Sequence, residues 1–173
     1  MSVTWYECKV KYRKTLESGE QKQVTETYLL DAVSYTEAEA RISEEMTAYT
    51  SEEFMITNIK VANLSEIHPF ENSDRWFKVK VSLIAYDDKS GKEKKSNIYL
   101  LIQANDVKEA FENTNQAMQN TMGEYTIPAI SESNILDVFP YFSGDEEPEG
   151  SSMNENSEEE VDIEELVEED EVV

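Results

Sequence analysis

Hydrophobic and polar side chains alternate along the first strand-like stretch of this chain. Between residues 5 and 13 every second position is apolar or aromatic, which is the period of a half-buried β-strand. Turn residues around Ser18-Gly19 follow, and residues 22–33 are predicted to return as the second strand of a hairpin. Residues 34–49 then change to a helical period, with Ser34 and Glu37 spaced as a capping box. A third strand over 54–62 and a short apolar closing segment over 64–70 complete the unit.

The same succession of elements occurs a second time, about seventy-one residues later. Trp5-Tyr6 returns as Trp76-Phe77, and Pro69 returns as Pro140. Tyr28-Leu29-Leu30 also returns, and a spacing of seventy-two in the middle of the unit indicates a small loop insertion that closes again. The body, residues 1–142, is therefore predicted to be a tandem duplication of a β-β-α-β unit, with copy one at about 4–70 and copy two at about 75–142.

One such unit is too small to bury its apolar face well. Two joined units can place both helices on one side of a common antiparallel sheet around one core. The sequence thus predicts an α+β fold, a pseudo-twofold two-layer sandwich made of an antiparallel sheet with two helices. Side-by-side units without a shared sheet are the alternative.

The composition changes abruptly at Ser143. The last thirty-one residues hold fifteen Asp and Glu and no Lys or Arg, so they carry most of the net charge of −23, and the body is about −8. Residues 143–173 are predicted to be a disordered acidic tail. Its apolar residues give it a candidate partner-docking role: Ile163, Leu166, Val167, Val172 and Val173. Such a tail resembles those of bacterial and phage single-stranded-DNA-binding proteins, which dock replication partners. A tail that only keeps the protein soluble is the alternative.

Motifs that carry catalytic chemistry are absent from the sequence. A single cysteine, Cys8, excludes an internal disulfide and a metal site built from several cysteines. The one histidine, His68, aligns with Phe139 of the second copy, which favours packing. No glycine-rich phosphate loop, nucleophile elbow, paired-histidine zinc motif or acidic calcium loop is present. We therefore expect no enzyme activity, no cofactor and no metal. Without a signal peptide or a long apolar run, a cytoplasmic location without membrane contact is expected.

One face of the first strand in each copy combines an aromatic ring with cations. The candidate nucleic-acid-binding residues are Trp5, Lys9, Lys11 and Arg13 in copy one and Trp76, Lys78 and Lys80 in copy two. Single-stranded nucleic acid is bound by this combination, because bases stack on rings while cations hold phosphates. The alternative is that both tryptophans pack under a helix or in the pseudo-twofold seam, while the lysines solvate a strand.

Several motifs together resemble a known family. They are Trp5-Tyr6-Glu7-Cys8-Lys9-Val10, Tyr28-Leu29-Leu30-Asp31-Ala32, Thr36-Glu37-Ala38-Glu39-Ala40, Asp74-Arg75-Trp76-Phe77-Lys78 and Asp137-Val138-Phe139-Pro140-Tyr141. The body resembles, over residues 4 to 142, an uncharacterised family of small proteins, a domain of unknown function, from Bacteroides-type bacteria and their phages. The resemblance implies a phage- or mobile-element-associated protein and transfers no functional residues.

The leading hypothesis is a non-enzymatic binding protein of single-stranded DNA or RNA, with the tail docking a replication or host protein. Two alternatives stay open. One is an acidic protein-interaction module or host-defence inhibitor that mimics the charge of nucleic acid. The other is a small-molecule sponge that captures a nucleotide messenger between the two copies. The chain is expected to act as a monomer or a homodimer.

Overall fold

The computed structural model describes residues 3–140, so the predicted tail and its five docking residues lie outside the described residues. The first copy contains two long strands, a helix and two further strands: β1 Thr4–Thr15, β2 Gln21–Ala32, α1 Tyr35–Tyr49, β3 Phe54–Val61 and β4 Glu66–His68. The second copy repeats this order with β5 Arg75–Tyr86, β6 Glu93–Ala104, α2 Val107–Ala117, β7 Glu124–Glu132 and β8 Ile135–Phe139. The α+β class and the repeated strand-strand-helix-strand order are confirmed.

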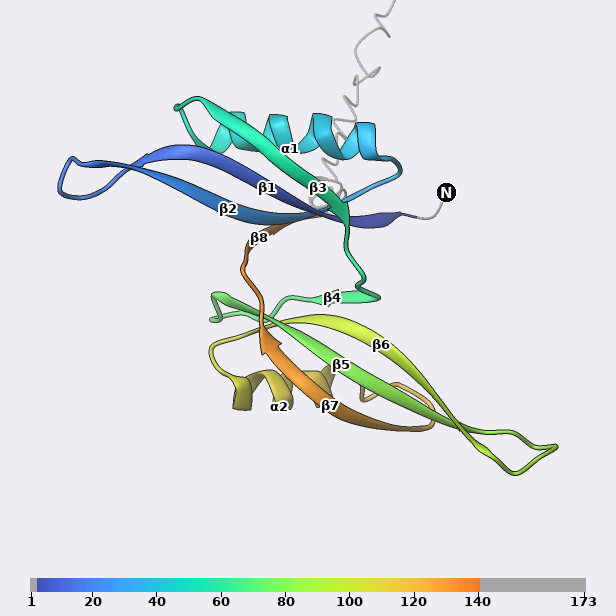
Figure 1. Cartoon of the computed structure of the whole chain (residues 1–173). Coiled ribbons are helices and arrows are strands. Elements are labelled where there is room, and N and C mark those ends of the chain that lie inside the picture. Colours follow the sequence, from blue (N-terminus) through green and yellow to red (C-terminus); the bar gives the residue numbers. More distant parts are fainter. Residues whose placement is uncertain (1–2, 141–173) are drawn as a thin grey trace, which may run out of the picture. The chain divides into compact units, whose positions relative to one another are not determined.

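The strands form two four-stranded sheets (Figure 1). Sheet A has the order β3-β1-β2-β8, and sheet B has the order β4-β6-β5-β7. Within each sheet the three long strands of one copy are antiparallel, but the short fourth strand comes from the other copy and pairs in parallel. The fold thus differs from one shared antiparallel sheet. The closing segment of each copy crosses over and completes the sheet of its neighbour.

The strand exchange follows the repeat. Val138 of β8 lies beside Leu29 of β2, and Ile67 of β4 lies beside Leu101 of β6. These two pairs are equivalent in the fold. Ile67 and Val138 are seventy-one residues apart, and Leu29 and Leu101 lie opposite the equivalent residues Glu7 of β1 and Lys78 of β5. The closing segment of each copy therefore forms the fourth strand of the other copy's sheet.

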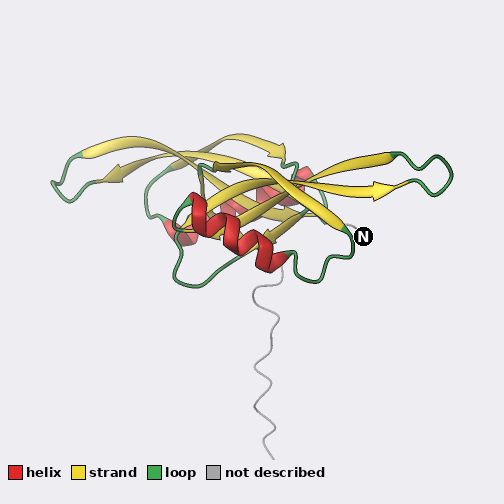
Figure 2. Ribbon diagram, turned by 90° about the horizontal axis from the view of Figure 1, so that it is seen from below, coloured by secondary structure: helices red, strands yellow, loops and turns green. Residues whose placement is uncertain are grey.

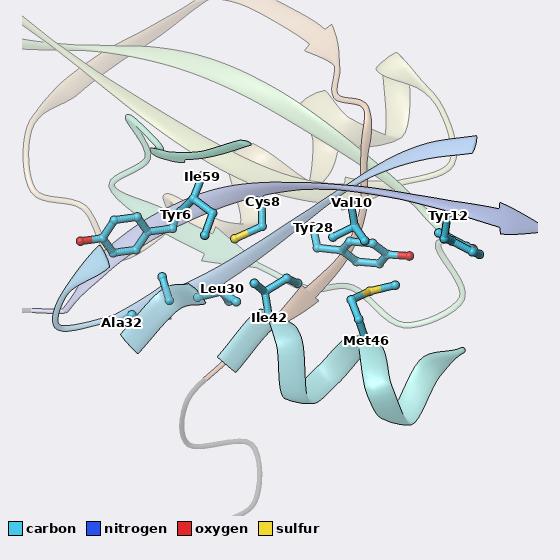
Figure 3. Packing of buried hydrophobic residues seen from close by; sticks show 11 residues of the cluster. Tyr6, Cys8, Val10, Tyr12, Tyr28, Leu30, Ala32, Ile42, Met46 and Ile59 are labelled. Atoms are coloured by element: carbon cyan, nitrogen blue, oxygen red, sulfur yellow. The ribbon is translucent and has the colours of Figure 1, made fainter. Parts of the chain in front are cut away.

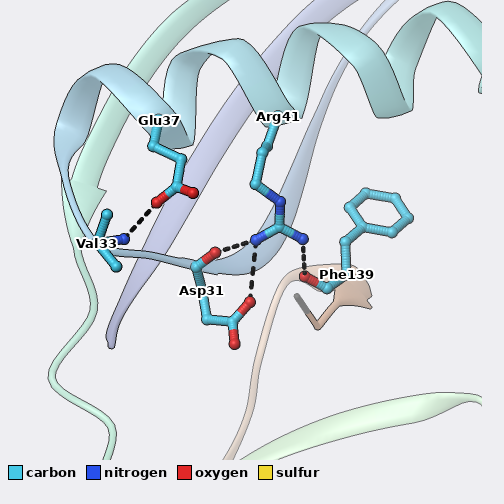
Figure 4. A network of polar contacts seen from close by, with 5 residues as sticks. All are labelled: Asp31, Val33, Glu37, Arg41 and Phe139. Atoms are coloured by element: carbon cyan, nitrogen blue, oxygen red, sulfur yellow. Dashed lines mark hydrogen bonds and ion pairs between the residues drawn. The ribbon is translucent and has the colours of Figure 1, made fainter. Parts of the chain in front are cut away.

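Both helices begin with the same reciprocal cap. The Ser34 hydroxyl accepts a hydrogen bond from the Glu37 amide at 3.2 Å, and the Glu37 carboxylate accepts one from the Val33 amide at 2.6 Å (Figure 4). In copy two the Asp106 carboxylate accepts from the Glu109 amide at 2.8 Å, and the Glu109 carboxylate accepts from the Asn105 amide at 3.2 Å. Each cap gives a partner to one amide of the first helical turn and to the amide of the residue before the N-cap, so Ser34 and Asp106 define where the helices begin.

Each helix covers one face of its own sheet. The cluster under α1 contains the apolar side of β1, three buried residues of β2 (Tyr28, Leu30 and Ala32) and the stripe Ala38, Ile42 and Met46 of the helix (Figure 3). The cluster under α2 is built in the same way from Phe77, Val79, Val81, Leu100, Ile102, Ala104, Ala110 and Met118. Because side chains alternate between the two faces of a strand, every second residue of each long strand points toward the helix of its own copy.

The opposite faces of the sheets supply a third cluster, which we call the seam. Its buried members are Leu29, Trp76, Leu101 and Ile135. Leu29 comes from sheet A and Leu101 from sheet B, so the seam joins the two copies. The far ends of the β1–β2 and β5–β6 hairpins project beyond the helices (Figure 2). Gly19 and Gly91 turn these hairpins with positive φ angles of 81° and 63°, a backbone conformation that glycine adopts readily.

Candidate binding sites

The two tryptophans lie in the seam. Trp76 is only 6% exposed, and Trp5 is half-buried against the same cluster. Both belong to the sheet faces turned away from the helices, as the alternation predicts. These faces meet each other, however, so neither ring stands on an open basic surface. Both positions therefore agree with the alternative interpretation of the sequence, in which the tryptophans pack in the seam between the two copies.

A pocket of about 430 Å³ opens at the seam. Six of its lining residues form three pairs that are equivalent in the repeat: Trp5 with Trp76, Ile67 with Val138, and Pro69 with Pro140. Gln103 and Asp137 supply the polar part of the lining. The pocket therefore lies where the two copies contribute the same residues from opposite sides. We call it the seam pocket.

The polar side chains of the seam pocket differ in what they offer a ligand. Gln103 is committed to the protein, because its amide oxygen accepts from the Phe70 amide and its amide nitrogen donates to the Ser73 carbonyl. Asp137 is exposed, and its Oδ1 accepts from the Val138 amide at 2.8 Å. Among the described residues, Oδ2 of Asp137 has no hydrogen-bond donor. The pocket thus offers apolar walls and one carboxylate oxygen.

The predicted lysines of β1 and β5 lie along the same strand faces as the tryptophans but outside the seam pocket. Lys78 places its ammonium 4.9 Å from the centre of the Tyr99 ring, a cation–π contact, and Lys80 is half-buried. Lys9 is half-buried on β1, and the neighbouring Glu7 forms an ion pair with Lys60 of β3 at 3.1 Å. None of these lysines lines the seam pocket.

Lys11 and Arg13 come together elsewhere. They line a groove of about 510 Å³ near the far end of β1, together with Gln21, Gln23 and Met55. Glu52 and Glu53 lie on the same wall, so the groove combines two cations, two amides and two carboxylates. We call it the arm groove. Of the seven predicted residues, the two tryptophans line the seam pocket and Lys11 with Arg13 line the arm groove, whereas Lys9, Lys78 and Lys80 line neither.

Sequence reasoning did not single out the remaining residues of the seam pocket. Ile67, Gln103 and Asp137 were missed, since an isolated residue of these types carries no chemical signature. The prolines offered the usable signal, because Pro69 and Pro140 recur at the repeat spacing directly after the closing segments. Two repeated prolines mark two chain segments that reach the same place from opposite copies.

The described residues contain no group of three or more His, Cys, Asp and Glu side chains arranged to hold a metal ion. His68 instead lies 2.7 Å from the Glu66 carboxylate. Across the same part of the chain, no helix has the length and apolar character needed to cross a membrane.

Comparison with known proteins gives a family and no activity. Residues 4–141 match the family described as a domain of unknown function, DUF4494, and the chain belongs to it. Neither the curated proteins nor the solved structures contain a significant match.

Proposed function

We propose that this DUF4494 protein is a non-enzymatic binding protein that captures a small flat molecule in the seam pocket. The observation that carries the proposal is the lining of the pocket. It consists mainly of three pairs that are equivalent in the repeat: one pair of tryptophans, one pair of prolines and one pair of branched aliphatic residues. Ligand sites are preferentially apolar cavities at the junction of structural units, with a few polar groups that set orientation. The volume of about 430 Å³ falls in the range of roughly 300–1,000 Å³ found for such sites.

The lining restricts the chemistry of the ligand. The pocket has no Lys or Arg in its lining, so a phosphate group inside it would lack a cation partner. The available oxygen of Asp137 favours a ring that carries an N–H donor or a positive charge. A heteroaromatic ring with an N–H donor fits both the apolar walls of the pocket and the available oxygen of Asp137. A nucleotide would insert only its base and leave its phosphates in solvent.

Titration with adenine and with tryptamine tests the proposal. Both probes are flat and carry N–H donors, and tryptamine adds a positive charge. Binding of adenine should change the intrinsic fluorescence of Trp5, which is half-buried in the pocket wall, whereas tryptamine is itself an indole fluorophore and is followed by calorimetry. Isothermal calorimetry gives the affinity without relying on that signal. Asp137→Asn should weaken tryptamine more than adenine, because only the charged probe loses an ionic partner.

Val138→Phe supplies a variant that fills the pocket, since Val138 is half-buried in its wall. Leu136→Phe is the matched control, because Leu136 is 46% exposed on the same strand and does not line the pocket. Binding should disappear in the first variant and persist in the second. Equal behaviour of the two variants, or no heat and no fluorescence change with either probe at millimolar concentration, contradicts the proposal.

A capture protein of this kind suits the phage or mobile-element setting that the sequence resemblance implies. In a cytoplasmic location it would withdraw a base-containing host messenger from its receptor. This setting is part of the proposal.

Single-stranded nucleic acid is the second candidate ligand, and the arm groove is the observation that favours it. Lys11 and Arg13 line it beside the amides of Gln21 and Gln23, which suits a phosphate backbone. In this form of the hypothesis the cations bind phosphates, and the buried Trp76 has no stacking role. The acidic residues of positions 143–173 would compete with nucleic acid and present the docking residues to a partner protein.

Fluorescence anisotropy with a labelled oligonucleotide separates this candidate from the first. Binding should weaken as salt rises, and the change Lys11→Ala/Arg13→Ala should reduce it. Lys108→Ala is the control, because Lys108 is an exposed lysine on α2. A chain that ends at Phe142 should bind more tightly than the full chain. If neither chain binds at low salt, the nucleic-acid candidate is excluded.

A further inference from the structure

β3 is the outermost strand of sheet A. It pairs with β1, and within residues 3–140 no strand pairs with its other side. β7 has the same place in sheet B, outside β5. An outer strand offers a row of backbone N–H and C=O groups to any further strand, so proteins protect such edges with charges, prolines or bulges.

The direction of the backbone groups on β3 follows from its pairing. The Ala62 amide donates to the Trp5 carbonyl at 2.8 Å, so the backbone amide of Ala62 points toward β1. Hydrogen-bonded and non-bonded residues alternate along an antiparallel pair. Val61 and Ile59 therefore direct their backbone groups outward. The irregularity between Lys9 and Val10 adds one residue to β3, so Ile56 and Phe54 continue the outward series.

The two equivalent edges differ in how they are protected. β7 carries a proline at Pro128 and a charge at Glu132, which forms an ion pair with Arg75. The equivalent residues of β3 are Thr57 and Val61. Thr126 of β7 corresponds to Met55, which is 65% exposed, and Val61 is 62% exposed. The protective residues of one edge are thus replaced on the other by threonine and exposed apolar side chains.

We propose that β3 pairs antiparallel with β3 of a second copy of this chain, which joins the two A sheets into one. The register that aligns the outward backbone groups places Phe54 opposite Val61 and Ile56 opposite Ile59. In this register Lys60 faces Met55 of the partner copy and lies diagonal to its Glu53, so opposite charges approach each other. A twofold contact of this kind is self-complementary and closed.

Charge and symmetry favour a second copy over another partner. Lys60 is the one charged residue within β3, and the register keeps the two Lys60 side chains apart. The exposed side chains of Met55 and Val61 become covered in the same contact. The inference is independent of the seam pocket, because no residue of β3 lines that pocket.

The substitution pair Met55→Thr/Val61→Glu tests the contact in the full chain. It copies the residues of β7 onto β3, at positions where the repeat already accommodates them. We expect the unchanged protein to sediment as a dimer and this variant to sediment as a monomer. Val107→Glu is the matched control, since Val107 is 54% exposed at the start of α2, where a carboxylate is tolerated. It should remain dimeric. Circular dichroism establishes that each variant is folded.

Hydrogen exchange provides a second measurement that does not depend on a variant. The Ile59 and Val61 amides should exchange more slowly at high protein concentration, where the dimer is populated. The equivalent amides of β7, at Ile130 and Glu132, should show no such dependence. A monomeric unchanged protein, or a dimer that persists in Met55→Thr/Val61→Glu, overturns the proposal.

Discussion

Trp5 and Trp76 occupy the same position in the two copies and line the same pocket, but they are buried to different extents. Trp76 is 6% exposed and is one of the buried residues of the seam, whereas Trp5 is half-buried and packs against them. Duplication therefore places two identical side chains at one junction without giving them the same surroundings. Trp76 is part of the hydrophobic core, whereas the ring of Trp5 remains accessible to a ligand.

This asymmetry predicts different costs for removing the two rings. Trp76→Ala should lower the free energy of unfolding by about 3–5 kcal/mol, because it removes a large buried side chain and leaves a cavity. Trp5→Ala should cost less, since solvent already reaches part of that ring. Chemical denaturation followed by circular dichroism measures both changes. A larger loss from Trp5→Ala would contradict the burial described for the seam.

The contacts of Arg41 are a second difference between the copies. Its guanidinium donates to the Asp31 carbonyl, forms an ion pair with the Asp31 carboxylate at 3.0 Å, and donates to the Phe139 carbonyl at 3.2 Å (Figure 4). It therefore attaches β8 to sheet A. In copy two the equivalent residue is Asn113, whose side-chain amide donates to the Gln103 carbonyl at 3.0 Å.

Replacing these side chains should have unequal effects. Arg41→Ala should cost about 1.5–3 kcal/mol, as expected for hydrogen bonds to a charged group, and Asn113→Ala about 0.5–1.5 kcal/mol. Because Arg41 and Asp31 are only 16% and 12% exposed, added salt should change the first loss little. Urea unfolding at two salt concentrations provides the measurement. Equal losses would show that Arg41 does not hold the exchanged strand.

Cys8 should be unreactive in the folded protein. Burial, the largest cause, raises the pKa of its thiol to about 12, and the nearby Glu7 acts in the same direction while Arg41 opposes it. At pH 8.5 the folded protein should therefore react with iodoacetamide far more slowly than the urea-unfolded chain. Rapid labelling of the folded protein would contradict this burial.

The same shift has a consequence for stability. The unfolded thiol loses its proton near its ordinary pKa of about 9, before the folded thiol does. The unfolded state then binds fewer protons, so stability falls as pH rises from about 9 toward 12. Burial also raises the pKa of Tyr12 and Tyr28, which adds to the fall at the upper end. Cys8→Ala should remove the part of the fall that begins near pH 9, measured by thermal melts across this range.

The fold was largely predictable because each local signal was strong and occurred twice. Alternation in β1 and β5, the capping boxes at Ser34 and Asp106 and the Ser-Gly turns all agree between the copies. The sheet arrangement was not predictable, because Ile67 and Val138 look equally apolar whether they close their own sheet or cross to the other. The positions of the candidate site residues relative to one another were not predictable for a related reason. Alternation assigns Trp76 to a face, but it cannot say that another sheet covers that face.

The exchange of β4 and β8 predicts that neither copy folds alone. Residues 1–72 lack β8 and expose Leu29, while residues 73–173 lack β4 and expose Trp76, Leu101 and Ile135. Each piece alone should therefore unfold without a cooperative transition. An equimolar mixture should recover the circular dichroism spectrum and a cooperative melt, since every backbone partner is then present. The division falls at Asn72, in the connection between the copies, so it interrupts no strand. If residues 1–72 alone melt cooperatively at the temperature of the full chain, the exchanged strands do not hold the copies together.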